Sequence, residues 1–412
     1  MEQLEKQIYD LSIKYTTETN KDYLKQYGQF FTLSDEILNK LIEDIPYNAD
    51  VLEPSCGTGI IILECIKNFK NFSLDAIEID KNIYTKTKKI FSSIDNIHFI
   101  NNDFLKHDFG KKKYDLIIGN PPYFEITKEN RVLITEEFKE IVSGRINIYS
   151  LFIYKCIKLL KPNGKLVFII PKTILSGKYF SKLRTFIHQN CNIIDIIKFD
   201  NNKLFKKVLQ SVIILKLELA SPIRQDYILT IENELYFVKD ITQLSLNVDT
   251  TTITKLNCIV KTGNIVWNQY KESLSNILLD DVDNKTLQLL YSSNIKNNNL
   301  ILENQVDDKV IKKQYMIVNE QNKHLIITGP YILINRIIGI DPPKLNIYFQ
   351  RNNGDESQCF IENHVNFIKG SIDNLTKIYK SLKDPRTIQF IKELIGNTQL
   401  SQYELENIIP IF

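Results

Sequence analysis

Residues 114–124, YDLIIGNPPYF, predict a buried β-strand that ends abruptly. The apolar run at residues 116–118 is typical of a parallel strand that is covered on both faces. Gly119 lets the chain turn, and the two prolines that follow end strand pairing because neither has an N–H. Pro121 also keeps Asn120 out of the helical region, so the Asn120 side chain is expected to project from the strand end.

This strand end is expected to be a rigid cluster of hydrogen-bond acceptors. The Asn120 side-chain oxygen and the Pro121 carbonyl can accept two N–H hydrogens, and the Tyr123 ring can stack on the molecule that carries them. Such a cluster suits a planar molecule with an amino group. An ordinary strand followed by a proline-rich turn is the alternative, because Asn-Pro is a common turn pair.

A second turn has the composition of a ligand-binding loop. Residues 51–59, VLEPSCGTG, predict a strand, a glycine-bearing turn and a helix N-terminus, the start of a nucleotide-binding βα unit. Gly57 and Gly59 allow a ligand to approach the backbone where helix N–H groups point outward. The spacing matches neither a dinucleotide fingerprint nor a P-loop. Glu53 would repel phosphate and suits a cationic amine; a plain strand-to-helix turn remains the alternative.

Two more strand ends carry polar residues. The strand predicted at 73–80 ends in acid, about 20 residues beyond the glycine turn, where ribose hydroxyls are held in such folds. Glu78 is the first candidate for binding the ribose hydroxyls, and Asp80 is the second. The next strand leads to Asp103, which can accept from an adenine amino group, and to Phe104, which can flank the ring.

Length and composition favour a soluble protein of two domains. The chain has 412 residues and a net charge of +3. It has no apolar run approaching the roughly 20 residues that cross a bilayer, so we expect no membrane association and a cytoplasmic location. Six scattered cysteines and five unclustered histidines argue against a metal site or a disulfide framework.

Charge is distributed unevenly along the chain. Lys and Arg outnumber Asp and Glu several-fold in residues 151–220, whereas residues 221–412 are nearly balanced. A basic band beside the proposed site could contact phosphates. A solvated helix face explains the same pattern equally well.

These stretches resemble the motifs of a known family. The Asn-Pro-Pro-Tyr turn resembles motif IV of the amino-methyltransferases, and residues 51–59 resemble motif I of S-adenosylmethionine (SAM) binders. The run GQFFT at 28–32 resembles motif X, and KLFKKVLQS at 203–211 resembles motif VIII. With stretches that resemble motifs II, III, V and VI between them, the order over residues 28–217 resembles that of the gamma-class N6-adenine DNA methyltransferases of restriction–modification systems.

The resemblance implies a fold and a division into domains. The expected fold class is α/β, a Rossmann-like doubly wound sheet of the SAM-dependent methyltransferases with a C-terminal α+β target-recognition domain. The expected segments are an N-terminal helix at 1–27, a SAM-binding catalytic domain at 28–220 and a DNA-binding target-recognition domain at 221–412.

The resemblance also assigns roles to residues. The catalytic turn consists of Asn120, Pro121, Pro122 and Tyr123. The target base would stack on Tyr123 and Phe205. The residues expected to bind SAM are Thr32, Glu53, Ser55, Gly57, Glu78, Ile79, Asp103 and Phe104. No metal ligand is implied.

The implied reaction is methyl transfer from SAM to N6 of an adenine in a specific sequence of double-stranded DNA. Because N6 is not reachable inside a duplex, the adenine must be flipped out. A separately encoded restriction endonuclease is a candidate partner. Three alternatives remain: methylation of a protein glutamine amide, methylation of RNA adenine, and a non-catalytic DNA-specificity subunit.

Overall fold

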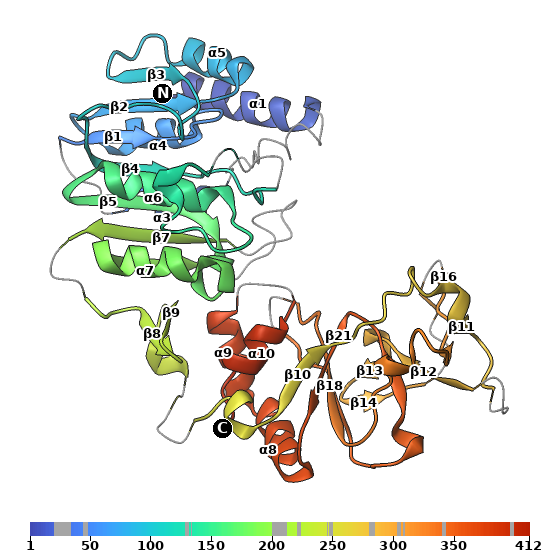
Figure 1. Cartoon of the computed structure of the whole chain (residues 1–412). Coiled ribbons are helices and arrows are strands. Elements are labelled where there is room, and N and C mark those ends of the chain that lie inside the picture. Colours follow the sequence, from blue (N-terminus) through green and yellow to red (C-terminus); the bar gives the residue numbers. More distant parts are fainter. Residues whose placement is uncertain are drawn as a thin grey trace. The chain divides into compact units, whose positions relative to one another are not determined.

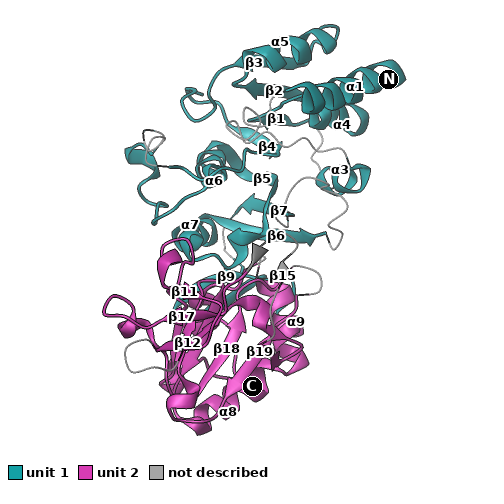
Figure 2. Cartoon of the chain, turned by 90° about the vertical axis from the view of Figure 1, so that its right-hand side faces the viewer, with its two compact units in different colours: residues 1–241 teal, residues 242–412 magenta. Residues whose placement is uncertain are grey.

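The computed structural model divides into two compact units, Met1–Ile241 and Thr242–Phe412 (Figure 2). The first unit extends beyond residue 220, where the sequence analysis placed the end of the catalytic domain, and includes the strands β8 and β9. The structure describes residues 1–19, 34–43, 48–127, 132, 134–199, 212–220, 224–244, 246, 250–279, 285–302, 306–307, 310–339, 343–395 and 399–412. The expected positions Thr32 and Phe205 lie outside these residues.

The first unit is built on a seven-stranded sheet of order β3-β2-β1-β4-β5-β7-β6 (Figure 1). Strands β3, β2, β1, β4 and β5 run parallel, and β7 is antiparallel to both β5 and β6. The strand order reverses between β1 and β4, which is where ligands bind in open α/β sheets. The strands of this unit are β1 (Asp50–Glu53), β2 (Ser73–Glu78), β3 (Ile97–Asn101), β4 (Tyr114–Gly119), β5 (Leu160–Pro171), β6 (Cys191–Lys198), β7 (Val212–Leu219), β8 (Ile228–Ile231) and β9 (Glu234–Phe237).

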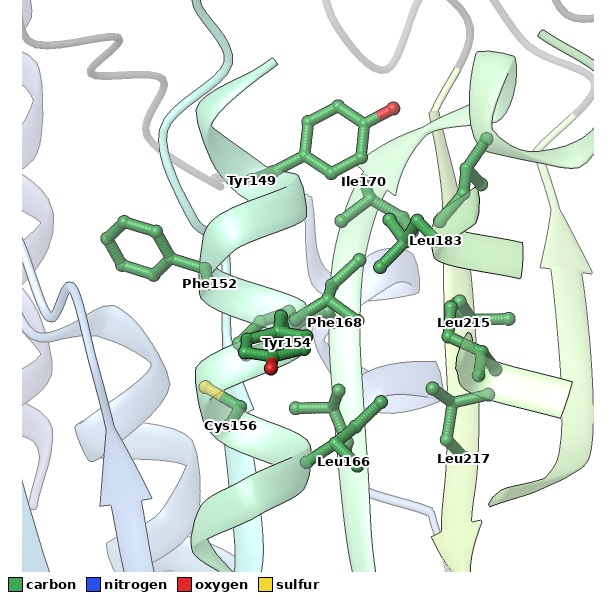
Figure 3. Close-up of a cluster of buried hydrophobic side chains, with 14 of the residues drawn as sticks. Tyr149, Phe152, Tyr154, Cys156, Leu166, Phe168, Ile170, Leu183, Leu215 and Leu217 are labelled. Carbon is green, nitrogen blue, oxygen red and sulfur yellow. The ribbon is translucent and has the colours of Figure 1, made fainter. Parts of the chain in front are cut away.

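Helices cover both faces of the sheet, because successive strand residues point to opposite sides. In β4, Ile117 packs into a core with α6 and α7, whereas Leu116 and Ile118 pack into a second core with α1, α3 and α4. Figure 3 shows part of the first core, between α6, β5, β7 and α7. The expected doubly wound α/β fold is therefore confirmed. The helices are α1 (Glu2–Glu18), α3 (Asp35–Leu41), α4 (Ile60–Asn68), α5 (Lys81–Ile90), α6 (Ile148–Leu159) and α7 (Ser181–Asn190).

Two elements differ from the sequence expectation. The N-terminal helix expected over residues 1–27 is described as α1, Glu2–Glu18, and residues 20–33 are not described. The sequence KPNG at 161–164 predicts the end of the preceding helix, and α6 does end at Leu159; the strand expected from Lys165 begins earlier, because β5 starts at Leu160 and pairs with Tyr114 before a register shift. Asn163 has φ +63°, so the Pro-Asn-Gly signal marks an irregularity inside the strand instead of a break before it.

The second unit is an α+β domain in which antiparallel pairing predominates. One four-stranded sheet has the order β10-β21-β18-β19 and another the order β11-β17-β12-β20. Its helices follow the strands in the chain and are α8 (Ile372–Leu382), α9 (Pro385–Leu394) and α10 (Gln402–Asn407). Its strands are β10 (Ile259–Thr262), β11 (Leu274–Ser275), β12 (Thr286–Leu290), β13 (Ile295–Lys296), β14 (Asn299–Leu300), β15 (Val306–Asp307), β16 (Val310–Ile311), β17 (Tyr315–Ile317), β18 (Tyr331–Asn335), β19 (Ile347–Gln350), β20 (Cys359–Ile361) and β21 (Val365–Lys369).

Within the described ranges, none of the helices has the length and apolar composition that a membrane crossing requires. The same ranges contain no group of three or more His, Cys, Asp or Glu side chains arranged to hold a metal ion.

The glycine turn before α4 requires glycine for two separate reasons. Gly59 has φ +82°, and a Cβ atom there would lie 2.6 Å from Cε2 of Phe91. Gly110 has φ +55°, but a Cβ atom would meet nothing within 4 Å. An alanine at Gly110 would introduce backbone strain alone, whereas an alanine at Gly59 would introduce both backbone strain and a steric clash.

We expect Gly110→Ala to cost about 1 kcal/mol of unfolding free energy through backbone strain alone, and Gly59→Ala at least about 3 kcal/mol. Urea unfolding of both variants would measure this difference. Equal losses would show that Phe91 moves aside without cost.

Candidate functional site

Three of the expected site segments meet at one edge of the sheet, because the parallel strands that carry them end together. Leu52 of β1 lies opposite Ile117 of β4, and Glu53 lies opposite Ala76 of β2. The glycine turn, the acidic end of β2 and the Asn-Pro-Pro-Tyr turn all begin within two or three residues of these pairs. The structure therefore places the expected catalytic and cofactor turns side by side.

A direct contact joins the two turns. The Ser55 hydroxyl lies 3.4 Å from the backbone oxygen of Asn120 and can donate to it. Gly119, just before Asn120, lies against both Pro54 and Phe168, since a Cβ atom there would be in ordinary van der Waals contact with each at 3.4 Å. The two turns thus form one packed unit.

The cofactor side of the edge is organised by the Glu78 carboxylate. One Glu78 oxygen accepts from the backbone N–H of Gly57 at 2.8 Å, and the other accepts from that of Asp80 at 2.8 Å. The Gly57 carbonyl in turn accepts from the Thr87 hydroxyl at 2.9 Å. The expected ribose-binding residue thus also fixes the glycine turn, and its remaining lone pairs can still accept from ligand hydroxyls.

Glu53 is the most unusual group of the site. It is 1% exposed, and its Oε2 atom has no hydrogen-bond partner among the described residues. Burial, followed by repulsion from Glu78, raises the pKa of Glu53 well above its ordinary value. A buried acceptor without a donor is costly unless a ligand supplies one. Together with Glu78 it favours a ligand that carries positive charge and hydrogen-bond donors.

The other expected cofactor residues are placed as follows. Ile79 is 51% exposed directly after Glu78. Asp103 accepts from the backbone N–H of Leu105 at 3.0 Å and remains partly exposed. Phe104 is 2% exposed, and its ring packs 4.8 Å from that of Phe152 in the core. A contact between Phe104 and a cofactor therefore stays a prediction, and the described ring lies mainly against protein.

In the turn that is expected to be catalytic, the Tyr123 hydroxyl contacts Asn120 and Ile169. It lies within hydrogen-bond distance of Oδ1 of Asn120, and it lies 2.7 Å from the Ile169 carbonyl oxygen of β5; either oxygen can accept its hydrogen. Burial raises the pKa of Tyr123 well above its ordinary value, so the phenol keeps its proton. The Tyr123 ring meets that of Tyr149 edge-on, with 6.3 Å between ring centroids. Ile169 was not expected at the site, because the sequence of β5 indicates only a core strand.

The chain is similar to known methyltransferases. Residues 23–205 match the model of the Eco57I restriction-modification methylase family. Over 154 residues the chain is 38% identical to modification methylase CviBIII from Paramecium bursaria Chlorella virus NC1A, a match that covers 36% of this chain and 37% of that protein. The chain thus spans little more than a third of the length of that relative.

Two further relatives match the chain over very different lengths. Type II methyltransferase M.CvrRI of Paramecium bursaria Chlorella virus XZ-6E is 27% identical over 410 residues, which cover 98% of each chain. The tRNA1(Val) (adenine(37)-N6)-methyltransferase of Vibrio vulnificus strain YJ016 is 26% identical over 169 residues, which cover 39% of this chain and 67% of that protein.

The buried carboxyl of Glu78 predicts a pH-dependent stability. Burial raises the pKa of Glu78 from its ordinary 4.5 to about 7. The folded protein therefore holds this proton more tightly than the unfolded chain, so the stabilisation is complete below about pH 4.5 and is lost as pH rises through about 7. We expect the unfolding temperature of the ligand-free protein to fall by roughly 5 °C over this window.

Thermal unfolding of a Glu78→Gln variant should show a shallower decline, because glutamine does not titrate. Glu136→Gln removes an exposed carboxyl, 86% accessible, and serves as the control. If Glu78→Gln and Glu136→Gln followed the same pH curve as the unchanged protein, the buried carboxyl would not be the source.

Proposed function

We propose that this chain, whose residues 23–205 match the Eco57I restriction-modification methylase family, transfers a methyl group from SAM to N6 of a flipped adenine in a specific sequence of double-stranded DNA. The observation that carries this proposal is the contact of Ser55 with Asn120, which joins an acidic cofactor turn to an Asn-Pro-Pro-Tyr turn at the switch point of the sheet.

The chemistry of the acidic side chains at the site fits SAM. SAM supplies an electrophilic methyl group on a sulfonium and also carries an ammonium group and a ribose. Glu53 and Glu78 would offset its positive charge, and the Glu78 oxygens would accept from the ribose hydroxyls. The unpartnered Oε2 atom of buried Glu53 would gain a donor. A phosphate-bearing cofactor would meet repulsion from both carboxyls.

The catalytic turn would act on the target amino group by hydrogen bonding and positioning. The lone pair of N6 is delocalised into the adenine ring, so the nitrogen is a weak nucleophile. Asn120 and the Pro121 carbonyl would accept its two hydrogens and favour the tetrahedral nitrogen that attacks the methyl group. The bond from N6 to the methyl group would form as the methyl–sulfur bond breaks, S-adenosylhomocysteine would leave, and the proton lost from N6 would pass to water. No covalent enzyme intermediate is needed. The adenine would stack on Tyr123 after it is flipped, at a cost of a few kcal/mol.

The Tyr123 hydroxyl has a role of its own in this proposal. A phenol has one hydrogen, so it cannot donate to both Asn120 and Ile169 at once. In the structure, Oδ1 of Asn120 faces the Tyr123 hydroxyl. Exchange of the amide nitrogen and oxygen of Asn120, which are told apart by their hydrogen bonds, would let the nitrogen donate to Tyr123 while the Tyr123 hydroxyl donates to Ile169. This arrangement would turn the amide oxygen of Asn120 away from Tyr123, in the orientation that an acceptor for the base requires.

The remaining assignments are part of the same proposal. The unit Thr242–Phe412 would recognise the DNA target, and the protein would act in the cytoplasm beside a separately encoded restriction endonuclease. Purified protein, SAM with a labelled methyl group, and duplex DNA, RNA or protein substrates would test the substrate class. N6-methyladenine in digested duplex DNA is expected. Methyl label found only in RNA or only in protein glutamine would contradict the proposal and support the corresponding alternative. Absence of SAM binding would favour a non-catalytic specificity subunit.

Asn120→Ala should lower methyl transfer by about 1,000-fold or more, because it removes a transition-state hydrogen bond. SAM affinity measured by calorimetry should remain within a few-fold of the unchanged protein. Asn68→Ala, on α4, is the matched control, because Asn68 donates to the Glu64 backbone away from the site. Parallel loss of SAM binding and turnover in Asn120→Ala would indicate a folding role.

Tyr123→Phe should keep the stacking ring but lower kcat by about 100-fold, because the Asn120 amide loses the partner that orients it. SAM affinity should be unchanged. Tyr149→Phe provides the control, since it removes a neighbouring buried hydroxyl whose partner is Thr173. Full activity of Tyr123→Phe would show that only the aromatic ring matters.

A further inference from the structure

The N-terminal helix α1 buries a stripe that is unusually polar. Its three buried residues, Ile8, Ser12 and Tyr15, follow the spacing of one helix face. A helix that only packs against a core buries apolar side chains along such a stripe. Two of the three here carry hydroxyl groups, and both hydroxyls contact residues beside the proposed cofactor site.

Ser12 contacts the glycine turn. The Ser12 and Thr58 hydroxyl oxygens lie 2.6 Å apart, and the two residues are 0% and 1% exposed. Ser12 also donates to the Ile8 carbonyl at 2.9 Å, which uses its single hydrogen. Both contacts are therefore satisfied when Thr58, the residue between the two glycines of the turn, donates to Ser12.

Tyr15 contacts the acidic end of β2. Its hydroxyl donates to Oδ2 of Asp80, whose Oδ1 atom accepts from the backbone N–H of Asn82 at 2.9 Å and caps α5. The backbone N–H of Asp80 donates to Glu78 at 2.8 Å. A continuous series of hydrogen bonds thus runs from α1 to the carboxylate that also holds the glycine turn.

Two outer contacts add little to this arrangement. Glu5 pairs with Lys67 of α4 at 2.8 Å, and Tyr9 donates to Asp35 of α3 at 3.0 Å. Both are solvent-accessible, and exposed pairs of this kind contribute little. The buried hydroxyls of Ser12 and Tyr15 are therefore the polar contacts of α1 that we expect to matter for the geometry of the site.

We propose that Ser12 and Tyr15 are positioning residues for SAM, which hold the glycine turn and the end of β2 in the geometry that binds it. This inference rests on the proposed function. Neither side chain touches the ligand in this role; each acts through Thr58 or Asp80. We call these two hydrogen bonds the α1 clasp.

The clasp would act by keeping the binding geometry populated before SAM arrives. Without the Ser12 hydroxyl, the buried Thr58 hydroxyl loses its acceptor and the turn relaxes to recover one. SAM must then select the fraction of molecules that still hold the binding geometry, and its apparent Kd rises in inverse proportion to that fraction. Once SAM is bound, the catalytic turn is unchanged.

The test uses Ser12→Ala and Tyr15→Phe in the full chain. We expect each to weaken SAM binding about tenfold, as for a binding geometry held by about one molecule in ten. At saturating SAM, kcat should stay within about twofold, because Asn120 and Tyr123 are untouched. Thr17→Ala is the matched control: it removes an exposed hydroxyl from the same helix, which donates to the Ile13 carbonyl.

A double-mutant cycle with Thr58→Val sharpens the result. If the Ser12–Thr58 bond carries the effect, the Ser12→Ala change should cost little further SAM affinity in the Thr58→Val background. The inference is overturned if Ser12→Ala binds SAM like Thr17→Ala, or if it lowers only the unfolding temperature. If the unchanged protein binds no SAM at all, the proposed function fails and the inference fails with it.

Discussion

The parallel register of β1 between β2 and β4 is the constraint on which the site depends. It brings three chain turns to one edge of the sheet, with Glu53, Glu78 and Asn120 each at or just beyond a strand end. Side-chain direction alternates along each strand, so a slip of one residue would exchange the core faces of the strand and rotate its terminal residue away. Burial of these strands on both faces by helices therefore also fixes the site.

The same burial makes the site energetically unfavourable without a ligand. Two carboxyls are enclosed where desolvation raises the pKa of each, and Glu53 repels Glu78. Hydrogen bonds from Gly57 and Asp80 offset this cost only for Glu78. A cationic ligand would relieve the repulsion, so under the proposed function the lower stability of the ligand-free site would accompany a higher affinity for SAM. This trade is typical of functional sites and explains why the glycine turn needs support from neighbouring elements.

Sequence reasoning succeeded where the signal is local. The strand–turn–helix at 51–59 and the strand ending at Gly119 depend on neighbouring residues, and both are present with the expected boundaries. Contacts across the sheet have no such signal: Ile169 meets Tyr123 only because β5 lies beside β4. The contacts of α1 with the glycine turn and with Asp80 were not predicted, because Ser12 and Tyr15 resemble ordinary helix residues in the sequence. Their spacing with Ile8 marks one face, but their partners lie more than 40 residues away.

Both halves of the proposed reaction lie within one unit. The residues expected to hold the methyl donor and those expected to hold the amino group are carried by strands of a single sheet and joined by the Ser55–Asn120 contact. Catalysis by positioning depends on the distance between donor and acceptor, and a rigid sheet fixes that distance independently of how DNA is recognised. The second unit has its own hydrophobic cores. If the second unit recognises DNA as proposed, its surface could change to recognise a different sequence without altering the geometry of methyl transfer.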